Sequence, residues 1–267
     1  MKHPIAIIGG SGVKSILKGT PKILGTPYGP TPNLTIGEIE SRPAVFLPRH
    51  GENHASPPHK VNYRANIWGL KSLGVERIIA TNAVGAIDQQ LTPGEIVVPS
   101  DIVDVTKSRI GTFYEGAPVT HIDVSQPYCP KIREVLTSST LANGRSRPKD
   151  VVMACTEGPR YETPAEIKML RTMGCQIVGM TGAPEAFLAR ELEMCYASIS
   201  FVSNMAAGLQ RALSAREVEE KGHETSKVLN RILTGAIAEI PESRKDCPCG
   251  TALAHAQLKK EEIQEIA

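Results

Sequence analysis

Arg49 and His50 stand side by side at the end of a short apolar run, residues 44–47. Such a run is typical of a buried strand, and ligands of α/β proteins bind beyond the carboxyl ends of such strands. The planar guanidinium fork of arginine can clamp a phosphate there, with the histidine beside it. A surface loop with incidental charges is the plainer interpretation, but His54 and His59 crowd the same segment. We therefore expect an anion site at this loop.

A glycine-rich turn follows the first predicted strand, residues 5–8. Gly9, Gly10 and Gly12 let backbone amides approach an anion, and the Ser11 hydroxyl adds a donor. The dinucleotide-binding fingerprint is not met, since the glycine spacing differs and no acidic residue closes a second strand about twenty residues later. A phosphate loop and a plain strand-to-helix turn are both open for this segment.

Small or polar residues also end or follow three other predicted strands. They are Asn82 with Ala83, Met180 with Thr181, and Asn204 with Ala206. They supply amides, a hydroxyl and a flexible apolar contact at the sheet edge where α/β proteins bind ligands. For the first pair, tight packing without a ligand is an equal alternative.

An aromatic residue lies beside a carboxylate ahead of a predicted helix. Tyr161 could pack on the ring of a base while Glu162 accepts an N–H from it. The plainer interpretation is a loop that ends in a helix cap, and Thr163 is expected to be that cap.

Short apolar runs alternate with helix-like segments along the chain. The predicted strands are residues 5–8, 44–47, 77–84, 96–99, 151–155, 176–180 and 195–202. Helices are expected over residues 61–73, from Pro184, and after capping boxes that start at Thr163 and Ser214. This alternation predicts an α/β fold with a largely parallel sheet in one domain, residues 1–240, followed by a peripheral tail, residues 241–267.

Composition limits the class of protein. The chain has 267 residues, 41 % of them hydrophobic, which is enough for a substantial core. Its 30 basic and 28 acidic side chains leave a net charge of +2, without the basic surplus of a polyanion binder. Neither a transmembrane run nor a signal peptide is recognisable. We expect a cytoplasmic protein that acts on small molecules and binds neither nucleic acid nor membrane.

Six cysteines are scattered along the chain, without the CxxC pair typical of a zinc site. Cys247 and Cys249 flank a proline in the tail, where they would form either a strained disulfide or two free thiols. In either state we expect them to influence thermal stability rather than catalysis. The redox state of Cys129 and Cys195 is equally open.

Seven motifs in register resemble the methylthioadenosine/purine nucleoside phosphorylases. They are Ile-Gly-Gly-Ser-Gly at residues 8–12, Arg-His-Gly at 49–51, Lys-Val-Asn-Tyr-Arg-Ala-Asn at 60–66, Thr-Asn-Ala-Val-Gly at 81–85, Glu-Gly-Pro-Arg at 157–160, Met-Thr-Gly-x-Pro-Glu at 180–185 and Cys-Tyr-Ala-Ser at 195–198. The resemblance runs from about residue 5 to residue 235. It implies a single-domain, three-layer α/β fold with a central twisted mixed sheet flanked by helices. Arg-His-Gly also resembles the histidine phosphatase signature, but that signature opens the first strand of its fold and nothing else here matches it.

The same resemblance implies a role for each candidate residue. Phosphate contacts would come from Ser11, Arg49, His50, Thr181 and the Ala83 backbone, with Asn82 next to the anion and the sugar. Met180 would pack beneath the ribose, and Tyr161 would line the base pocket. His121 looks like the residue that such enzymes lend to a neighbouring subunit's 5′ pocket, so a homotrimer or a dimer of trimers is expected.

In this family phosphate itself attacks C1′ as the bond to the base breaks. The resemblance therefore implies phosphate as a co-substrate and no covalent nucleophile, metal or cofactor. The enzyme holds phosphate beneath C1′ and stabilises the charge that develops on the departing purine. His50 at the phosphate and Asn204 at the base are the residues expected to act in catalysis.

Two positions depart from the adenine-specific branch of the family. Where that branch has two aspartates, this chain has Asn204 and Ala206, and an asparagine amide can donate to O6 and accept from a protonated N7. Glu162 replaces a serine of the adenine enzymes; it would accept the N1–H of a 6-oxopurine but face a lone pair on adenine. Each mispaired buried group costs about 1–3 kcal/mol, so we expect 6-oxopurines to be preferred.

The start of the last long helix predicts the 5′ substituent. Ala215 replaces the histidine that enzymes of ordinary ribosides place there, and Val218 lies one turn along. A small apolar pocket suits S-methyl-5′-thioinosine, whereas a roomy one would admit inosine or guanosine with water. The alternatives are an S-methyl-5′-thioadenosine phosphorylase, a nucleoside hydrolase and a non-enzymatic nucleoside-binding protein.

Overall fold

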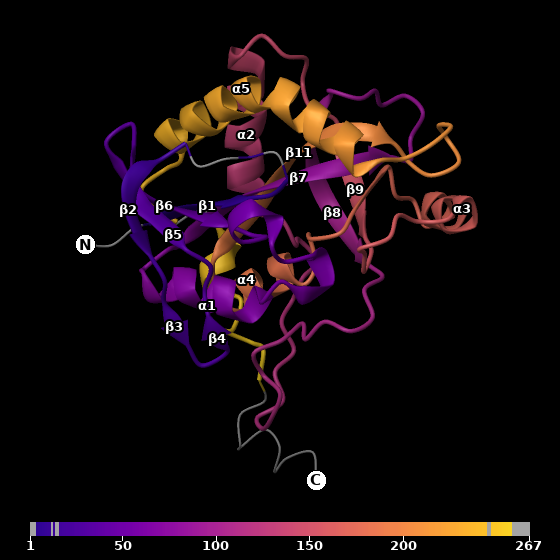
Figure 1. Ribbon diagram of the computed structural model, residues 1–267. Helices are drawn as coiled ribbons and strands as arrows, with labels where there is room; N and C mark the ends of the chain where they lie inside the picture. The colour runs from indigo at the N-terminus through magenta and orange to yellow at the C-terminus, as the bar shows by residue number, and fades with distance from the viewer. Residues whose placement is uncertain (1–3, 12, 14–15, 245–246, 258–267) are drawn as a thin grey trace.

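The computed structural model describes residues 4–11, 13, 16–244 and 247–257, and these form three layers (Figure 1). Helices α2 (Pro130–Ala142) and α5 (Ala215–Glu239) cover one face of a central sheet. Helices α1 (Tyr63–Ser72) and α4 (Glu185–Glu191) cover the other, and α3 (Pro164–Thr172) lies to one side. The predicted α/β fold, a mixed sheet flanked by helices, is confirmed.

Within the described residues the sheet has nine strands, in the order β10-β9-β8-β11-β7-β1-β6-β5-β2. In chain order they are β1 (Ile5–Gly9), β2 (Lys18–Lys22), β5 (Leu34–Ile39), β6 (Arg42–Pro48), β7 (Arg77–Ala86), β8 (Ile96–Asp104), β9 (Asp150–Cys155), β10 (Ile177–Gly179) and β11 (Cys195–Met205). Because β10 also pairs with β7, the strands β7, β11, β8, β9 and β10 close into a ring. β3 (Gly25–Thr26) and β4 (Gly29–Pro30) form a separate hairpin.

Every strand predicted from an apolar run is present, but the strands between residues 18 and 39 were not predicted. β2 has the sequence Lys-Gly-Thr-Pro-Lys and is exposed throughout, as an edge strand can be when it is held only through its backbone. β2 and β5 are antiparallel to their neighbours, as are the β8–β11 and β7–β10 pairs. The sheet is therefore less parallel than the apolar runs alone indicated.

The helices follow the predicted start signals, with two exceptions. Thr163 and Glu166 form the complete capping box that was predicted for α3. Ser214 caps α5 by accepting from the Glu217 N–H, but the Glu217 carboxylate accepts from Gln210 instead, so the second predicted box is only half formed. α2 was not predicted: Cys129 at its N-cap is not a typical capping residue, and Pro130 at its first position was the available start signal. Short 3₁₀ turns are η1 (Glu52–His54), η2 (Pro58–Lys60) and η3 (Pro248–Thr251).

The alternation of side chains along the central strands builds one core on each face of the sheet. Ile199 and Phe201 pack with Leu229 and Leu233 beneath α5 and α2. On the other face, Tyr196 packs with residues of α1 and α4. β1, β7 and β11 are buried almost throughout, which accounts for their uninterrupted apolar sequences.

Four parallel strands end side by side and so bring the loops after them together. β1 pairs with β6 and β7, and β7 pairs with β11, with Gly9 opposite Pro48 and Ala80 opposite both Ile8 and Ser198. None of the helices in the described part of the chain is long and apolar enough to cross a membrane. The division at residue 240 stays a prediction.

Candidate active site

One open cleft of about 1210 Å³ lies at the carboxyl ends of these strands. It is larger than the roughly 300–1,000 Å³ of most small-molecule sites. Thirteen of the residues predicted from the sequence line it: Ser11, Arg49, His50, Asn82, Ala83, Tyr161, Glu162, Met180, Thr181, Asn204, Ala206, Ala215 and Val218. Of the predicted set, only His121 is absent from the lining.

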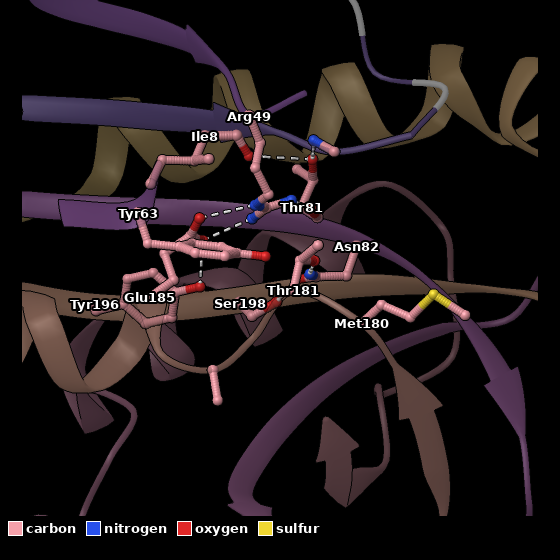
Figure 2. A network of polar contacts seen from close by, with 12 residues as sticks. Ile8, Arg49, Tyr63, Thr81, Asn82, Met180, Thr181, Glu185, Tyr196 and Ser198 are labelled. Carbon is pink, nitrogen blue, oxygen red and sulfur yellow. Dashed lines mark hydrogen bonds and ion pairs between the residues drawn. The ribbon is translucent and has the colours of Figure 1, made fainter. Parts of the chain in front are cut away.

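The guanidinium of Arg49 is fully buried beside the cleft and is already paired (Figure 2). Nε and Nη2 donate to the two carboxylate oxygens of Glu185 at 2.8 and 2.7 Å, and Nη1 donates to the Thr81 carbonyl at 2.9 Å. Glu185 occupies the fork formed by Nε and Nη2, and the predicted contact of Arg49 with phosphate stays a prediction. Only the remaining N–H groups of Nη1 and Nη2 are left for an anion.

Glu185 was not predicted to belong to the site, although it opens α4 as expected. Its carboxylate has no exposed surface and also accepts a hydrogen bond of 2.7 Å from the Tyr196 hydroxyl. Burial by itself would lower the pKa of Arg49, but the attraction of Glu185 outweighs burial and holds that pKa above its usual value. The pair orients the guanidinium without adding net charge to the cleft.

Gly10 lets the turn after β1 lie directly against this pair. A Cβ at Gly10 would be 2.3 Å from the Thr81 carbonyl oxygen and 2.8 Å from Arg49 Nη1, so only glycine fits. The Gly10 N–H donates to the Thr81 hydroxyl at 2.9 Å. The next described element is the strand β2, so the interpretation of a strand-to-helix turn does not hold.

His50 and His54 form a stacked pair at the same end of the cleft, with ring centroids 4.6 Å apart. His50 Nδ1 lies 2.8 Å from the Ser56 carbonyl oxygen, which can only accept, so Nδ1 carries the proton and Nε2 offers a lone pair. Burial, together with the charge of Arg49, lowers the pKa of His50 to about 4. Ser11 Oγ lies 3.0 Å from His54 Nε2. His50 is therefore a neutral acceptor near neutral pH.

Asn82 orients Thr181 through a chain of three side chains (Figure 2). The Ser198 hydroxyl donates to Asn82 Oδ1 at 2.5 Å, and Asn82 Nδ2 donates to Thr181 Oγ1 at 2.8 Å. Since the Thr181 oxygen accepts from Asn82, its own proton is free to donate to a ligand in the cleft. Ser198 was not predicted as a site residue; it comes from β11 and lies 116 positions from Asn82 in sequence.

Asn204 lines the cleft beside an irregularity in β11, opposite Gly85 of β7. The register of β11 on β7 shifts between Val202 and Asn204, and bulges of this kind often re-aim side chains at sites. Asn204 Oδ1 accepts from the Ser203 hydroxyl at 2.5 Å, and Nδ2 donates to the Met205 carbonyl at 2.9 Å. The amide keeps one N–H and one lone pair, so it can donate and accept at the same time.

Glu162 and Tyr161 line the cleft as well. Glu162 Oε1 accepts from the Thr156 hydroxyl at 2.6 Å, which fixes the carboxylate and leaves Oε2 for a ligand. Burial raises the pKa of Tyr161, so its ring serves as a neutral contact surface. Met180 also lines the cleft as a flexible apolar contact.

The sequence profile described as the Phosphorylase superfamily matches residues 4–238. The chain belongs to this superfamily. The family predicted from seven short motifs, and the pentosyltransferase class of enzyme that it implies, are thereby confirmed.

Named relatives of this superfamily member fall into more than one substrate group. The chain is 48 % identical over 264 residues to a probable S-methyl-5′-thioinosine phosphorylase of Methanothermobacter thermautotrophicus. This match covers 97 % of this chain and 91 % of the relative. It is 45 % identical over 262 residues to the 6-oxopurine nucleoside phosphorylase of Pyrococcus furiosus, with 94 % and 98 % covered. An S-methyl-5′-thioadenosine phosphorylase of Nitrosopumilus maritimus is 42 % identical over 258 residues, with 95 % and 98 % covered.

A solved structure shares the fold over nearly the whole chain. Methylthioadenosine phosphorylase from Schistosoma mansoni in complex with adenine superposes with a TM-score of 0.90 at 31 % identity, covering 96 % of this chain and 99 % of that one.

His121 lies outside the cleft, on the irregular segment between β8 and α2. Its side chain is exposed, and its backbone N–H donates to the Ala256 carbonyl at 2.8 Å. Ile110, Val119 and Val124, on the same segment, expose large apolar side chains. The structure thus separates His121 from the site of its own chain, and its predicted role in a neighbour's pocket stays a prediction.

Helix α5 contributes a polar stripe to the cleft that was not predicted. Beyond Ala215 and Val218, the lining includes Glu219, His223, Ser226 and Asn230. These residues recur every three or four positions and so share one helix face, while Leu229 and Leu233 face the core. The three- and four-residue spacing of these polar positions along the helix was the available signal.

Arg109 joins three segments of the site through hydrogen bonds to their carbonyls. The sequence did not predict this role. Its guanidinium donates to the carbonyls of Met180 and Ala183 at 2.7 Å each and to that of Glu157 at 2.6 Å. A fourth bond, of 3.1 Å, joins it to the Tyr63 hydroxyl. A lone arginine in an irregular segment carries no local signal of such a role.

Proposed function

We propose that the chain catalyses phosphorolysis of purine nucleosides to the free base and ribose 1-phosphate or its 5-methylthio form, with phosphate as co-substrate. The observation that carries the proposal is that one cleft joins two subsites of different chemistry. Ser11 and His50 both contact His54, and Asn82 of β7 holds Thr181. Asn204 lies opposite Gly85, three residues further along β7, and Thr156 holds Glu162. Met180 lines the same cleft, where a ribose would connect base and phosphate.

Phosphate would be held mainly by neutral groups at the first of these subsites. The Thr181 hydroxyl proton, which Asn82 leaves free, would donate to a phosphate oxygen. The Ala83 backbone and Ser11 would add further donors. The Nε2 lone pair of His50 accepts the hydroxyl of monohydrogen phosphate. The N–H groups that Arg49 retains supply the residual positive field. Phosphate would thereby be oriented beneath C1′, and its nucleophilic oxygen would be left free to attack.

The leaving purine would be stabilised at the second subsite. Asn204 donates its remaining N–H to O6 and accepts from N7 as that nitrogen takes up a proton. Negative charge develops on the base as the glycosidic bond breaks, so this contact strengthens in the transition state. Removing a donor of this kind typically costs about 2.7–4 kcal/mol.

We propose that 6-oxopurines are preferred. Glu162 Oε2 is free to accept the N1–H of hypoxanthine or guanine, and Thr156 holds the carboxylate in place. Relatives named for S-methyl-5′-thioinosine and for 6-oxopurines support this choice. Another relative is named an S-methyl-5′-thioadenosine phosphorylase, and this activity is the alternative.

The 5′ end of the substrate would lie against α5. Ala215 and Val218 offer a small apolar surface that suits a methylthio group, and S-methyl-5′-thioinosine is the favoured substrate. Glu219 follows on the same helix face and offers a polar contact. Inosine and guanosine, which carry a 5′-hydroxyl, are therefore the next most favoured substrates. In a homotrimer or a dimer of trimers, His121 of a neighbouring subunit would complete this pocket, and the exposed apolar residues beside it support such an interface. The reaction as proposed uses no metal or cofactor, and a cytoplasmic location stays a prediction.

The test is base release from S-methyl-5′-thioinosine, S-methyl-5′-thioadenosine, inosine and guanosine, each with and without phosphate. Phosphate-dependent turnover of the 6-oxo substrates alone supports the proposal. Turnover without phosphate would indicate a hydrolase, and binding without turnover a nucleoside-binding protein. The Asn204→Asp variant should shift preference toward adenine nucleosides, while Asn143→Asp, at the end of α2, should not. Strong wild-type turnover of S-methyl-5′-thioadenosine would overturn the base assignment.

A further inference from the structure

Four cysteines that are far apart in the sequence meet at the amino end of β11. Cys129 is the N-cap residue of α2, Cys195 begins β11, and Cys247 and Cys249 come from the tail around η3. All four sulfur atoms lie within 4.8 Å of one another. We call these residues the cysteine cluster. The other two cysteines, Cys155 and Cys175, are elsewhere in the fold.

The spacing of the sulfurs matches a metal site better than a disulfide. Cys247 Sγ is 3.4 Å from Cys129 Sγ and 3.5 Å from Cys195 Sγ. A disulfide requires about 2.05 Å. Four sulfurs at about 2.3 Å from a tetrahedral zinc ion are separated by about 3.8 Å, which follows from the geometry of a tetrahedron. No two sulfurs of the cluster are more than 4.8 Å apart, so small shifts would bring all four to the spacing that such an ion needs.

Groups that stabilise negative charge lie beside the cysteine cluster. Arg77, Lys131 and Arg244 line a small cavity beside the cluster. Cys129 stands at the N-terminus of α2, where the helix dipole stabilises an anion. A zinc tetrathiolate has a net charge of −2, and these groups would balance it.

Burial also fits a structural metal rather than a reactive thiol. Cys129, Cys195 and Cys249 are nearly inaccessible to solvent, and Cys247 is only partly exposed. A closed site with four protein ligands and no open position is typical of structural zinc. The Cys-x-Cys spacing in the tail is tighter than the usual Cys-x₂₋₄-Cys, but the other two ligands come from the sheet and α2, so the site is assembled by the fold.

We propose that the cysteine cluster is a structural zinc site that fastens the tail to the amino edge of the sheet. Zn²⁺ binds as the four thiols lose their protons to solvent, without any change of oxidation state. β11 rises about 3.3 Å per residue, so Cys195 lies about 30 Å from Asn204. The ion would therefore act on stability and not on the reaction. This inference departs from the prediction, made from the absent CxxC pair, that no zinc site exists.

The test begins with the wild-type chain purified under reducing conditions. Elemental analysis should find a single zinc ion per chain. Cobalt substitution should give the thiolate-to-cobalt charge-transfer and intense visible bands of a tetrahedral tetrathiolate. Removal of zinc by a chelator should lower Tm, and adding zinc back should restore it.

Variants then separate the cluster from the other cysteines. Cys249→Ser should weaken zinc binding by more than the roughly 10–100-fold that follows loss of a mere outer hydrogen-bonding partner. It should lower Tm while leaving kcat below the unfolding transition unchanged. Cys175→Ser, a buried cysteine outside the cluster, should keep the zinc.

Two results would overturn the proposal. One is that the reduced wild-type chain takes up neither zinc nor cobalt. The other is that thiol counting and peptide mass analysis find the four cysteines joined as disulfides in metal-free protein that has not been exposed to added oxidant. Because the measurements use the wild-type chain, they decide the matter even if a variant fails to fold.

Discussion

Strand β11 begins at the cysteine cluster and ends in the cleft, so a single strand joins two regions that use polar groups differently. In the cleft, hydrogen-bonding capacity is left over: Thr181 keeps a proton, Asn204 keeps one N–H and one lone pair, and the buried Oδ1 of Asn230 has no partner. At the amino edge, the four thiols contact each other. A binding site needs polar groups that the fold holds in place while part of their hydrogen-bonding capacity stays free for a ligand. In a structural anchor the polar groups interact with one another instead.

The difference also appears in how each region treats charge. The cleft buries Arg49 but neutralises it with Glu185, so the guanidinium is oriented without attracting an anion at full strength. The amino edge gathers Arg77 and Arg244 around thiols that are close enough to share one ion. Substitutions should therefore change activity at one end of β11 and stability at the other, with the Arg49–Glu185 pair changing both.

The largest effect is expected from Glu185→Gln. This substitution keeps the shape of the side chain but leaves Arg49 buried beside an uncharged amide. Breaking a buried pair in this way costs about 3–5 kcal/mol of the free energy of unfolding, and phosphorolysis should be lost with it. Urea denaturation and an activity assay measure both. The double variant R49M/E185L, which removes both charges, should recover stability but not activity. Wild-type stability in Glu185→Gln would show that the pair does not hold the cleft together.

Asn204→Ala should separate chemistry from stability. Loss of the donor to the departing base should lower kcat/KM by about 100- to 1000-fold, because 2.7–4 kcal/mol of transition-state stabilisation is removed. Tm should change little, since the Ser203 hydroxyl keeps its bond to the Val84 carbonyl. Cys249→Ser should show the opposite pattern. If both variants changed Tm equally and spared kcat, the comparison between the two ends of β11 would fail.

The pH dependence of stability tests the neutral state of His50. Its pKa in the folded chain is about 4, against an ordinary value of 6.5, so the unfolded chain binds more protons between these two pH values. Stability should therefore fall as the pH drops from 6.5 to 4, by up to about 3 kcal/mol. In His50→Asn this part of the slope should disappear, while the exposed His255→Asn should retain it. Equal slopes in wild type and His50→Asn would contradict the assignment.

The smallest of these effects is expected from Arg109→Lys. A single ammonium group cannot reach the carbonyls of Glu157, Met180 and Ala183 together. We expect a loss of about 1–3 kcal/mol in the free energy of unfolding and a higher KM for both substrates, because the segments at both ends of the ribose loosen. Arg216→Lys, on the exposed face of α5, is the matched control and should change neither. An unchanged KM in Arg109→Lys would reduce this residue to a purely structural one.

Much of the site could be predicted because its parts are local. The strands at the cleft carry their ligand-binding residues in their carboxyl halves or just after their ends, so a buried apolar run marks both the strand and the place of Asn82, Thr181 or Asn204. Thr163 shows the same at helix α3, where four consecutive residues contain the whole capping box. The exposed β2 was missed because a strand held at an edge through its backbone needs no apolar pattern.

The sequence by itself determined the positions of the apolar strands, the capping box of α3 and thirteen of the residues that line the cleft, because each of these depends on neighbours a few positions away. Only the tertiary structure decided that Glu185 occupies the fork of Arg49, that α5 turns a polar stripe toward the cleft, and that Cys129 and Cys195 meet the cysteines of the tail. These contacts join residues dozens to more than a hundred positions apart. Their partners are chosen by strand order and register, which no local pattern contains.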